Sequence, residues 1–97
     1  MNQNWCVYVI RCSDGSLYTG ITTDMARRLH QHADGKGAKY FRGRVPEQVV
    51  YLETQHTRSS ASKRELQIKT MQRSEKLELI ESYTDHEVTG EFQTEVL

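Results

Sequence analysis

Apolar and β-branched residues dominate two short stretches near the start of the chain. The first stretch covers residues 5–12 and has the sequence WCVYVIRC, and the second covers residues 17–21. Side chains of this kind favour extended strands. The residues between them, Ser13, Asp14 and Gly15, are typical of a tight turn, so the sequence predicts an antiparallel hairpin.

Helical spacing replaces this pattern after the hairpin. Met25 and Leu29 are four positions apart, which indicates a short helix that ends at about His32 or Ala33. Thr23 or Asp24 can cap its first turn, because both side chains offer an oxygen to the free backbone N–H groups there.

The middle of the chain combines a loop, a strand and the start of a second helix. Residues 34–39 contain two glycines and predict a basic loop, whereas residues 48–53 are rich in strand-forming side chains and predict a third strand. We expect the second helix to begin at about Ser60 to Ser62, because Ser62 and Glu65 have the spacing of a capping box. Its apolar contacts would come from Leu66, Ile68 and Met71.

A third, short helix capped by Ser74 should carry a further apolar set, Leu77, Ile80 and Tyr83. Beyond this point the pattern weakens, and residues 84–97 predict either a loosely held tail or a late strand. The order β-β-α-β-α-α predicts an α+β fold on a small antiparallel sheet. We expect one folded domain over residues 1–83, because a chain of 97 residues supports a single compact core, with an acidic tail over residues 84–97.

Charged residues are distributed unevenly, although the net charge is zero. Residues 1–76 contain all 13 Lys and Arg against seven acids, a charge of +6, whereas residues 77–97 contain six acids and no base. A basic body is typical of proteins with a polyanionic partner, and the acidic tail offers a surface for a protein partner. The alternative is ordinary solvated faces with a tail that maintains solubility. Oligomeric state does not follow from these features.

Neither membrane insertion nor disulfide chemistry is indicated. The longest apolar runs, such as residues 7–10, are far shorter than the ~20 residues that cross a bilayer, and the first residues do not resemble a signal peptide. We expect a cytoplasmic protein without membrane contact. Cys6 and Cys12 lie six positions apart in one predicted strand, too far for a disulfide, and form no CxxC pair, so we expect buried, small apolar side chains.

The length of the predicted turn decides whether Tyr8 and Tyr18 share a face of the sheet, because side chains alternate along a strand. A two-residue turn at Asp14 and Gly15 would place them on opposite faces. A three-residue loop closed by Gly15 would pair Tyr8 with Gly20 and bring both tyrosines to one face. The longer loop is favoured, because its common form is a type I turn followed by a left-handed glycine.

Spacing downstream of the hairpin adds charged and titratable groups. Arg28 lies ten positions after Tyr18, and His32 lies four positions later on the same helical face. Together with Cys6-Val7-Tyr8, Tyr18-Thr19-Gly20 and a later Glu65, this pattern resembles the GIY-YIG endonuclease superfamily. More narrowly, the strings YTGITTD, RRL and GKGAKY resemble the small single-domain bacterial proteins of the YhbQ type. The resemblance covers residues 5–83 and implies a three-stranded antiparallel sheet flanked by helices, with a nuclease active site on the sheet.

The resemblance implies one role for each of five residues. Tyr8 would be the general base for the attacking water, with Tyr18 beside it. Arg28 would hold the scissile phosphate, and His32 would hydrogen-bond to a tyrosine or phosphate oxygen. Glu65 would bind one Mg²⁺ or Mn²⁺ ion that stabilises the leaving oxygen, unless it is occupied as a helix cap. A free tyrosine is only ~0.1% ionised at pH 7, so the base role requires positive charge nearby.

A basic run with aromatic residues follows the first predicted helix. It is suited to phosphate contacts and to stacking on an unpaired base of nucleic acid, DNA in preference to RNA, although a solvated loop is the alternative. Its residues are Lys36, Lys39, Tyr40, Phe41, Arg42 and Arg44.

Two departures from the family pattern define the competing functions. Cys6-Val7 stands where glycine and isoleucine are usual, and no asparagine follows Asn4, so Gln67 or Gln72 would have to replace a late asparagine. The leading hypothesis is a metal-dependent DNA endonuclease, selective for structured or single strands, with a role in repair or recombination. The alternative is a nucleic-acid-binding module without turnover.

Overall fold

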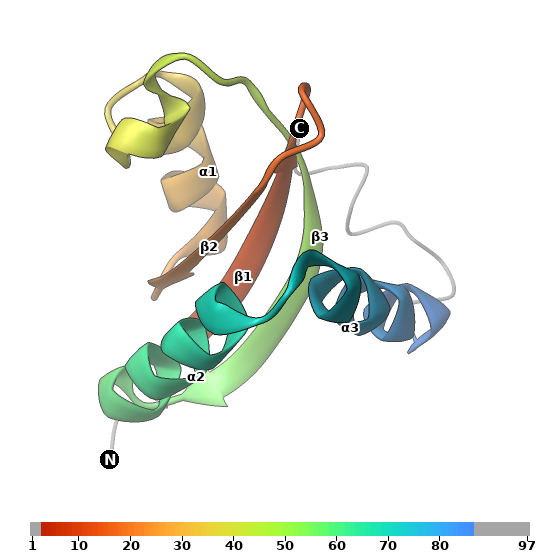
Figure 1. The fold of residues 1–97 in the computed structure, drawn as a ribbon. Coiled ribbons are helices and arrows are strands. Elements are labelled where there is room, and N and C mark those ends of the chain that lie inside the picture. Colours follow the sequence, from red (N-terminus) through yellow and green to blue (C-terminus); the bar gives the residue numbers. More distant parts are fainter. Residues whose placement is uncertain (1–2, 87–97) are drawn as a thin grey trace.

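Three antiparallel strands form one sheet in the order β2-β1-β3, with helices on both faces (Figure 1). The structure is a computed structural model and describes residues 3–86. Its elements are β1 (Trp5–Cys12), β2 (Leu17–Thr22), α1 (Met25–Ala33), the 3₁₀ helix η1 (Lys39–Arg42), β3 (Pro46–His56), α2 (Arg58–Thr70) and α3 (Arg73–His86). The expected α+β class and element order are confirmed.

The hairpin has the three-residue loop that the sequence favours. The Cys12 N–H donates to the Ser16 carbonyl and the Gly15 N–H donates to the Cys12 carbonyl, each at 2.9 Å. Gly15 has φ = 86°, a left-handed conformation that glycine adopts without steric cost. Tyr8 consequently pairs with Gly20, as predicted.

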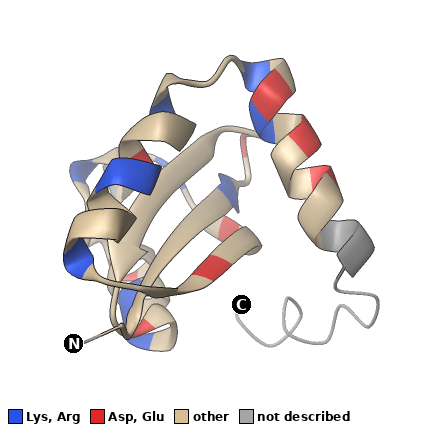
Figure 2. Cartoon of the chain, turned by 90° about the horizontal axis from the view of Figure 1, so that it is seen from below, with Lys and Arg blue, Asp and Glu red and all other residues tan. Residues whose placement is uncertain are grey.

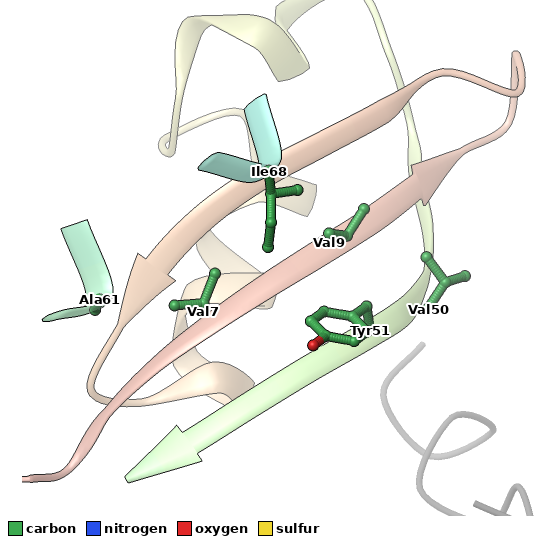
Figure 3. Packing of buried hydrophobic residues seen from close by; sticks show 6 residues of the cluster. All are labelled: Val7, Val9, Val50, Tyr51, Ala61 and Ile68. Atoms are coloured by element: carbon green, nitrogen blue, oxygen red, sulfur yellow. The ribbon is translucent and has the colours of Figure 1, made fainter. Parts of the chain in front are cut away.

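Alternation along β1 divides the core into two layers. Val7 and Val9 face α2 and α3, whereas Tyr8 and Ile10 face α1 and η1. Figure 3 shows Ile68 of α2 pointing toward the first of these faces. Cys12 is buried in the second cluster, as expected, whereas Cys6 is only partly buried, and both are free thiols.

The start of α2 differs from the prediction. Thr57 is the N-cap, with its hydroxyl oxygen accepting from the Ser60 N–H at 3.1 Å, while the Ser60 hydroxyl accepts from the Thr57 N–H at 3.0 Å. The predicted box of Ser62 and Glu65 is therefore wrong, because Ser60 fills the third helical position that Glu or Gln usually fills. The carboxylate of Glu65 is free of any capping role.

The apolar contacts of the last two helices are also partly different. Leu66 and Leu77 were expected to pack, but they are 64% and 46% exposed. Ala61 and Leu79 occupy the corresponding core positions. Ser74 does not cap α3, because the helix begins one residue earlier.

The C-terminal helix carries part of the predicted acidic segment. α3 extends to His86, beyond the expected boundary of the domain, and presents Glu78 and Glu81 on its exposed side (Figure 2). The rest of the tail, residues 87–97, lies outside the described residues. None of the described helices combines the length and apolar character needed to cross a bilayer. The expected cytoplasmic location stays a prediction.

Candidate active site

A buried hydrogen bond joins Tyr8 of β1 to His32 of α1, with 2.8 Å between the Tyr8 hydroxyl oxygen and His32 Nε2. The two side chains are 0% and 1% exposed. The other ring nitrogen, Nδ1, accepts the backbone N–H of Ala38 at 3.3 Å. Because a backbone N–H can only donate, Nδ1 carries no hydrogen in the neutral ring, and Nε2–H is the donor to Tyr8.

Two glycines make room for this pair. A Cβ atom at Gly20 would lie 2.5 Å from the Tyr8 hydroxyl oxygen, and a Cβ atom at Gly37 would overlap Nδ1 of His32. Any larger residue would displace the tyrosine or the histidine. The register predicts the space at Gly20, whereas the contact at Gly37 joins a loop to a helix and has no local signal beyond the GKGAKY string.

Tyr18 lies on the same face as Tyr8, as the predicted register requires. Its ring centroid is 6.2 Å from that of Tyr8 and 5.4 Å from that of His32. Phe41 of η1 packs against both Tyr18 and His32, with centroid distances of 4.9 and 4.3 Å. Phe41 is only 4% exposed, so the prediction that it stacks on a nucleic-acid base is wrong. It instead holds the histidine against the sheet.

Of the remaining residues of the basic run, some pack against other side chains and others are exposed to solvent. The ring of Tyr40 lies 5.2 Å from that of Tyr18, and the guanidinium of Arg44 lies 4.3 Å from the Tyr40 centroid. Arg44 also pairs with Asp14 at 3.3 Å. Lys36 and Lys39 are exposed, whereas the side chain of Arg42 is outside the described part of the structure. Lys36 and Lys39 therefore remain the accessible candidates for phosphate contacts.

All four other predicted site residues act on the Tyr8 hydroxyl. Burial is the main cause that raises the pKa of Tyr8 well above its usual range, and Tyr18 and the charge of Glu65 act in the same direction. Arg28 opposes them through a hydrogen bond and its positive charge, while His32 contributes the hydrogen bond described above. The same burial, with the charge of Arg28, lowers the pKa of His32 to about 4. His32 is therefore neutral at pH 7.

Glu65 is the one candidate metal ligand of the set. Its half-buried carboxylate pairs with Lys69 of the same helix at 3.2 Å. Such partly exposed pairs contribute ~0–1 kcal/mol, so a divalent cation can displace the lysine. Within residues 3–86, no three His, Cys, Asp or Glu side chains are grouped closely enough to hold a metal. A carboxylate oxygen suits Mg²⁺ or Mn²⁺, provided that waters and substrate complete the shell.

The proposed replacements for the missing asparagine lie on the surface. Gln67 is exposed and accepts a hydrogen bond from Arg64 at 3.1 Å, and Gln72 is exposed just before α3. Neither contacts the Tyr8 and His32 pair in any hydrogen bond that the described residues form.

The tyrosine pair on a β-hairpin, joined by Arg and His from α1 beneath a three-stranded sheet, is the arrangement of a GIY-YIG domain. The sequence matches the model of the GIY-YIG catalytic domain over residues 4–78, so the chain belongs to the GIY-YIG nuclease superfamily, as the resemblance predicted. It is 52% identical to the UPF0213 protein HQ_3675A of Haloquadratum walsbyi over 88% of this chain and 96% of that protein.

Further relatives and a solved structure agree with this assignment. The UPF0213 protein SERP0126 of Staphylococcus epidermidis is 51% identical over 77% of this chain and 92% of its own length. The solution NMR structure of the UPF0213 protein BH0048 from Bacillus halodurans aligns with a TM-score of 0.52 and 43% identity, covering 79% of this chain and 82% of that one. The three-stranded α+β fold is thus shared with an experimentally determined relative.

Proposed function

We propose that this protein is a metal-dependent endonuclease that hydrolyses phosphodiester bonds of DNA, in structured or single strands such as those formed during repair and recombination. The observation that carries the proposal is the convergence of His32, Arg28, Tyr18 and Glu65 on the Tyr8 hydroxyl. Arg28 and the hydrogen bond from His32 would stabilise a tyrosinate, whereas burial, Tyr18 and the charge of Glu65 oppose it, so a tyrosine base at neutral pH requires the added positive charge of a bound metal ion.

Each side chain has a definite task in this mechanism. Tyr8, as the tyrosinate, takes a proton from water while the water oxygen bonds to phosphorus and the bond to the leaving oxygen breaks. His32 donates its Nε2–H to the tyrosine oxygen and stays neutral. Arg28 balances the charge of the phosphate. Because Tyr8 is fully covered in this structure, substrate reaches it only when a covering group moves, and Tyr18 is the partly exposed ring beside it.

Glu65 would hold the divalent ion through its carboxylate oxygens. When bound, one Mg²⁺ or Mn²⁺ supplies positive charge that stabilises the leaving oxygen. Lys69 neutralises the same carboxylate in the absence of the ion.

Labelled branched, single-stranded and duplex DNA, incubated with Mg²⁺, tests the proposal. Tyr8→Phe should lower the cleavage rate by ~10²–10⁴, the usual contribution of a general base, and Glu65→Gln should abolish the response to metal. Tyr51→Phe is the matched control, because it removes the same hydroxyl on the opposite face of the sheet. Cleavage that survives in both site variants would overturn the assignment.

A second candidate function is a nucleic-acid-binding module without turnover. The complete burial of Tyr8 and its raised pKa favour this alternative, because an inaccessible, protonated tyrosine is a poor base. Binding of the same DNAs without cleavage in Mg²⁺ or Mn²⁺ would select it.

A further inference from the structure

A hollow of about 180 Å³ lies beside α1, where β1 begins and β2 ends. Its lining combines one large aromatic ring with hydroxyl, amide and guanidinium groups. The residues that matter here are Trp5, Thr22, Arg27, Arg28 and Gln31. The basic loop and the tyrosine pair are not among its lining residues, so Arg28 is the one residue that the hollow shares with the proposed reaction centre.

Arg28 connects the hollow to the reaction centre. Arg28 is one of the residues that line the hollow, and its positive charge also favours the ionised form of the Tyr8 hydroxyl. Along β2, Gly20 pairs with Tyr8 and Thr22 follows two residues later at the hollow. Two strand residues span about 7 Å, a distance that one nucleotide can bridge. Since β2 is an edge strand, a substrate strand can follow this edge from one position to the other.

The charges around the hollow favour an anion. Arg27 and Arg28 both line it, and the one acid, Asp24, is occupied because its carboxylate caps α1 by accepting the Arg27 N–H at 3.1 Å. The side-chain oxygen Oε1 of Gln31 accepts a hydrogen bond from the guanidinium of Arg28 at 3.0 Å. The side-chain NH₂ group of Gln31 is therefore left as a donor. Two cations and an oriented amide suit a phosphate and the polar edge of a base.

Trp5 supplies a surface for stacking. Its side chain is half-buried and the guanidinium of Arg58 lies 5.6 Å from its ring centroid, which fixes the ring and adds positive charge. Drug-sized ligands occupy pockets of roughly 300–1,000 Å³, so this smaller hollow has room for one aromatic base and is too small to enclose a base pair.

We infer that the hollow is a subsite for the nucleotide next to the scissile phosphate, with an unpaired base stacked on Trp5 and its phosphate held by Arg27 and Arg28. This inference rests on the proposed nuclease function and adds a substrate class to it, a strand whose base is unpaired or flipped beside the cleavage point. Stacking of one base on an aromatic side chain should strengthen binding about tenfold.

The chain contains a single tryptophan, so its own fluorescence reports on the subsite. The full chain, without metal so that no turnover occurs, is titrated with a short oligothymidylate and with an abasic oligonucleotide of equal length. The thymidylate should quench Trp5 and bind about tenfold more tightly, whereas the abasic strand retains only the phosphate contacts. Equal affinities, or thymidylate binding without a fluorescence change, would overturn the subsite.

Two variants separate stacking from loss of structure. Trp5→Leu should remove the preference for thymidylate over the abasic strand, with unchanged affinity for the abasic strand showing that the fold persists. Arg27 is exposed, so Arg27→Gln should leave the fold intact and weaken the binding of both oligonucleotides equally. The slope of log affinity against log salt concentration should become shallower by about 0.7, because one phosphate contact is lost. Lys63→Gln, an exposed cation of α2, is the matched control. A thymidylate preference retained in Trp5→Leu would refute the site.

These outcomes are distinct from those of the nuclease test. Quenching and base preference without cleavage of any DNA would refute the nuclease function and leave a nucleotide-binding site. Cleavage that depends on Tyr8 but shows neither quenching nor base preference would refute the subsite and leave the nuclease function.

Discussion

His32 is the donor and Tyr8 the acceptor in the buried contact between them, because the Ala38 N–H occupies the other nitrogen of the imidazole. A neutral histidine in this tautomer cannot take the proton of the tyrosine. It can stabilise the negative oxygen once that proton has left. The histidine therefore supports the base, and the loop that carries Ala38 determines in which direction the hydrogen bond runs.

Removal of one backbone N–H tests this arrangement. Ala38 has φ = −66° and ψ = 149°, a backbone conformation that proline adopts. Ala38→Pro deletes the N–H donor to Nδ1, and the proline ring carbon that replaces the hydrogen also pushes the imidazole away from its present position. We expect both neutral tautomers of His32 to be populated, visible in its ¹⁵N chemical shifts, and a several-fold loss of cleavage. Ala38→Gly retains the N–H and should keep the original tautomer. An unchanged tautomer in Ala38→Pro would contradict the assignment.

Acidification should unfold the protein partly through His32. The folded state holds the pKa of His32 at about 4, below the ordinary value of ~6.5 in the unfolded chain, so the unfolded state binds the extra proton. The stability from neutral His32 is complete above pH ~6.5 and is lost as the pH falls to about 4, on the order of 3 kcal/mol in total.

Denaturant unfolding between pH 7 and pH 5 measures this effect. His32→Gln cannot titrate, so its free energy of unfolding should depend less on pH in that interval, although it is less stable at pH 7. The carboxylates of Asp14 and Glu53, whose pKa values are lowered, contribute chiefly at more acidic pH in both proteins. Parallel pH profiles for the two proteins would show that His32 is not held neutral.

Local turn chemistry accounts for what the sequence predicts well. Gly15 fixes the loop length, the loop length fixes the register, and the register places Tyr8, Tyr18 and Gly20 together. Each step depends on neighbours in the chain, so an isolated sequence contains the information.

The features that the sequence does not predict depend on contacts between segments that are distant along the chain. Phe41 has the sequence context of an exposed basic loop, but η1 folds back and buries it against His32. The cap of α2 was predicted at Ser62 from its spacing to Glu65, but Thr57 and Ser60 have the same spacing and form the capping box instead. Tertiary packing decides both cases.

Substitution by alanine should destabilise the protein at Gly20, beside the tyrosine pair, but not at Gly43, after η1. In Gly20→Ala the new Cβ would meet the Tyr8 hydroxyl and, at 3.0 Å, the Tyr18 ring, so we expect a loss of about 1–3 kcal/mol in unfolding free energy and loss of cleavage. Gly43→Ala is the control, because no atom lies within 4 Å of the added carbon. Equal stability of the two variants would show that Tyr8 is not held against Gly20.

The pH dependence of cleavage should identify the ionising group. Because the pKa of Tyr8 is raised, the rate should increase about tenfold per pH unit through the neutral and mildly alkaline range. His32 is neutral throughout, so no second limb is expected between pH 6 and 7. Single-turnover rates at saturating DNA give the profile, and a bell with a limb near pH 6.5 would indicate that a histidine transfers the proton instead.

The acidic C-terminal segment should weaken nucleic-acid binding through simple electrostatics. A chain that ends at His86 loses three carboxylates, Glu87, Glu91 and Glu95, and its net charge rises from zero to +3. Its affinity for DNA should increase several-fold at low salt, and the gain should vanish near 1 M salt, where charges are screened beyond ~3 Å. Replacing the three glutamates with glutamine in the full chain separates charge from length. If this variant binds as wild type does while the shortened chain binds more tightly, the tail acts by occupying space near the basic surface and its charge is not the cause.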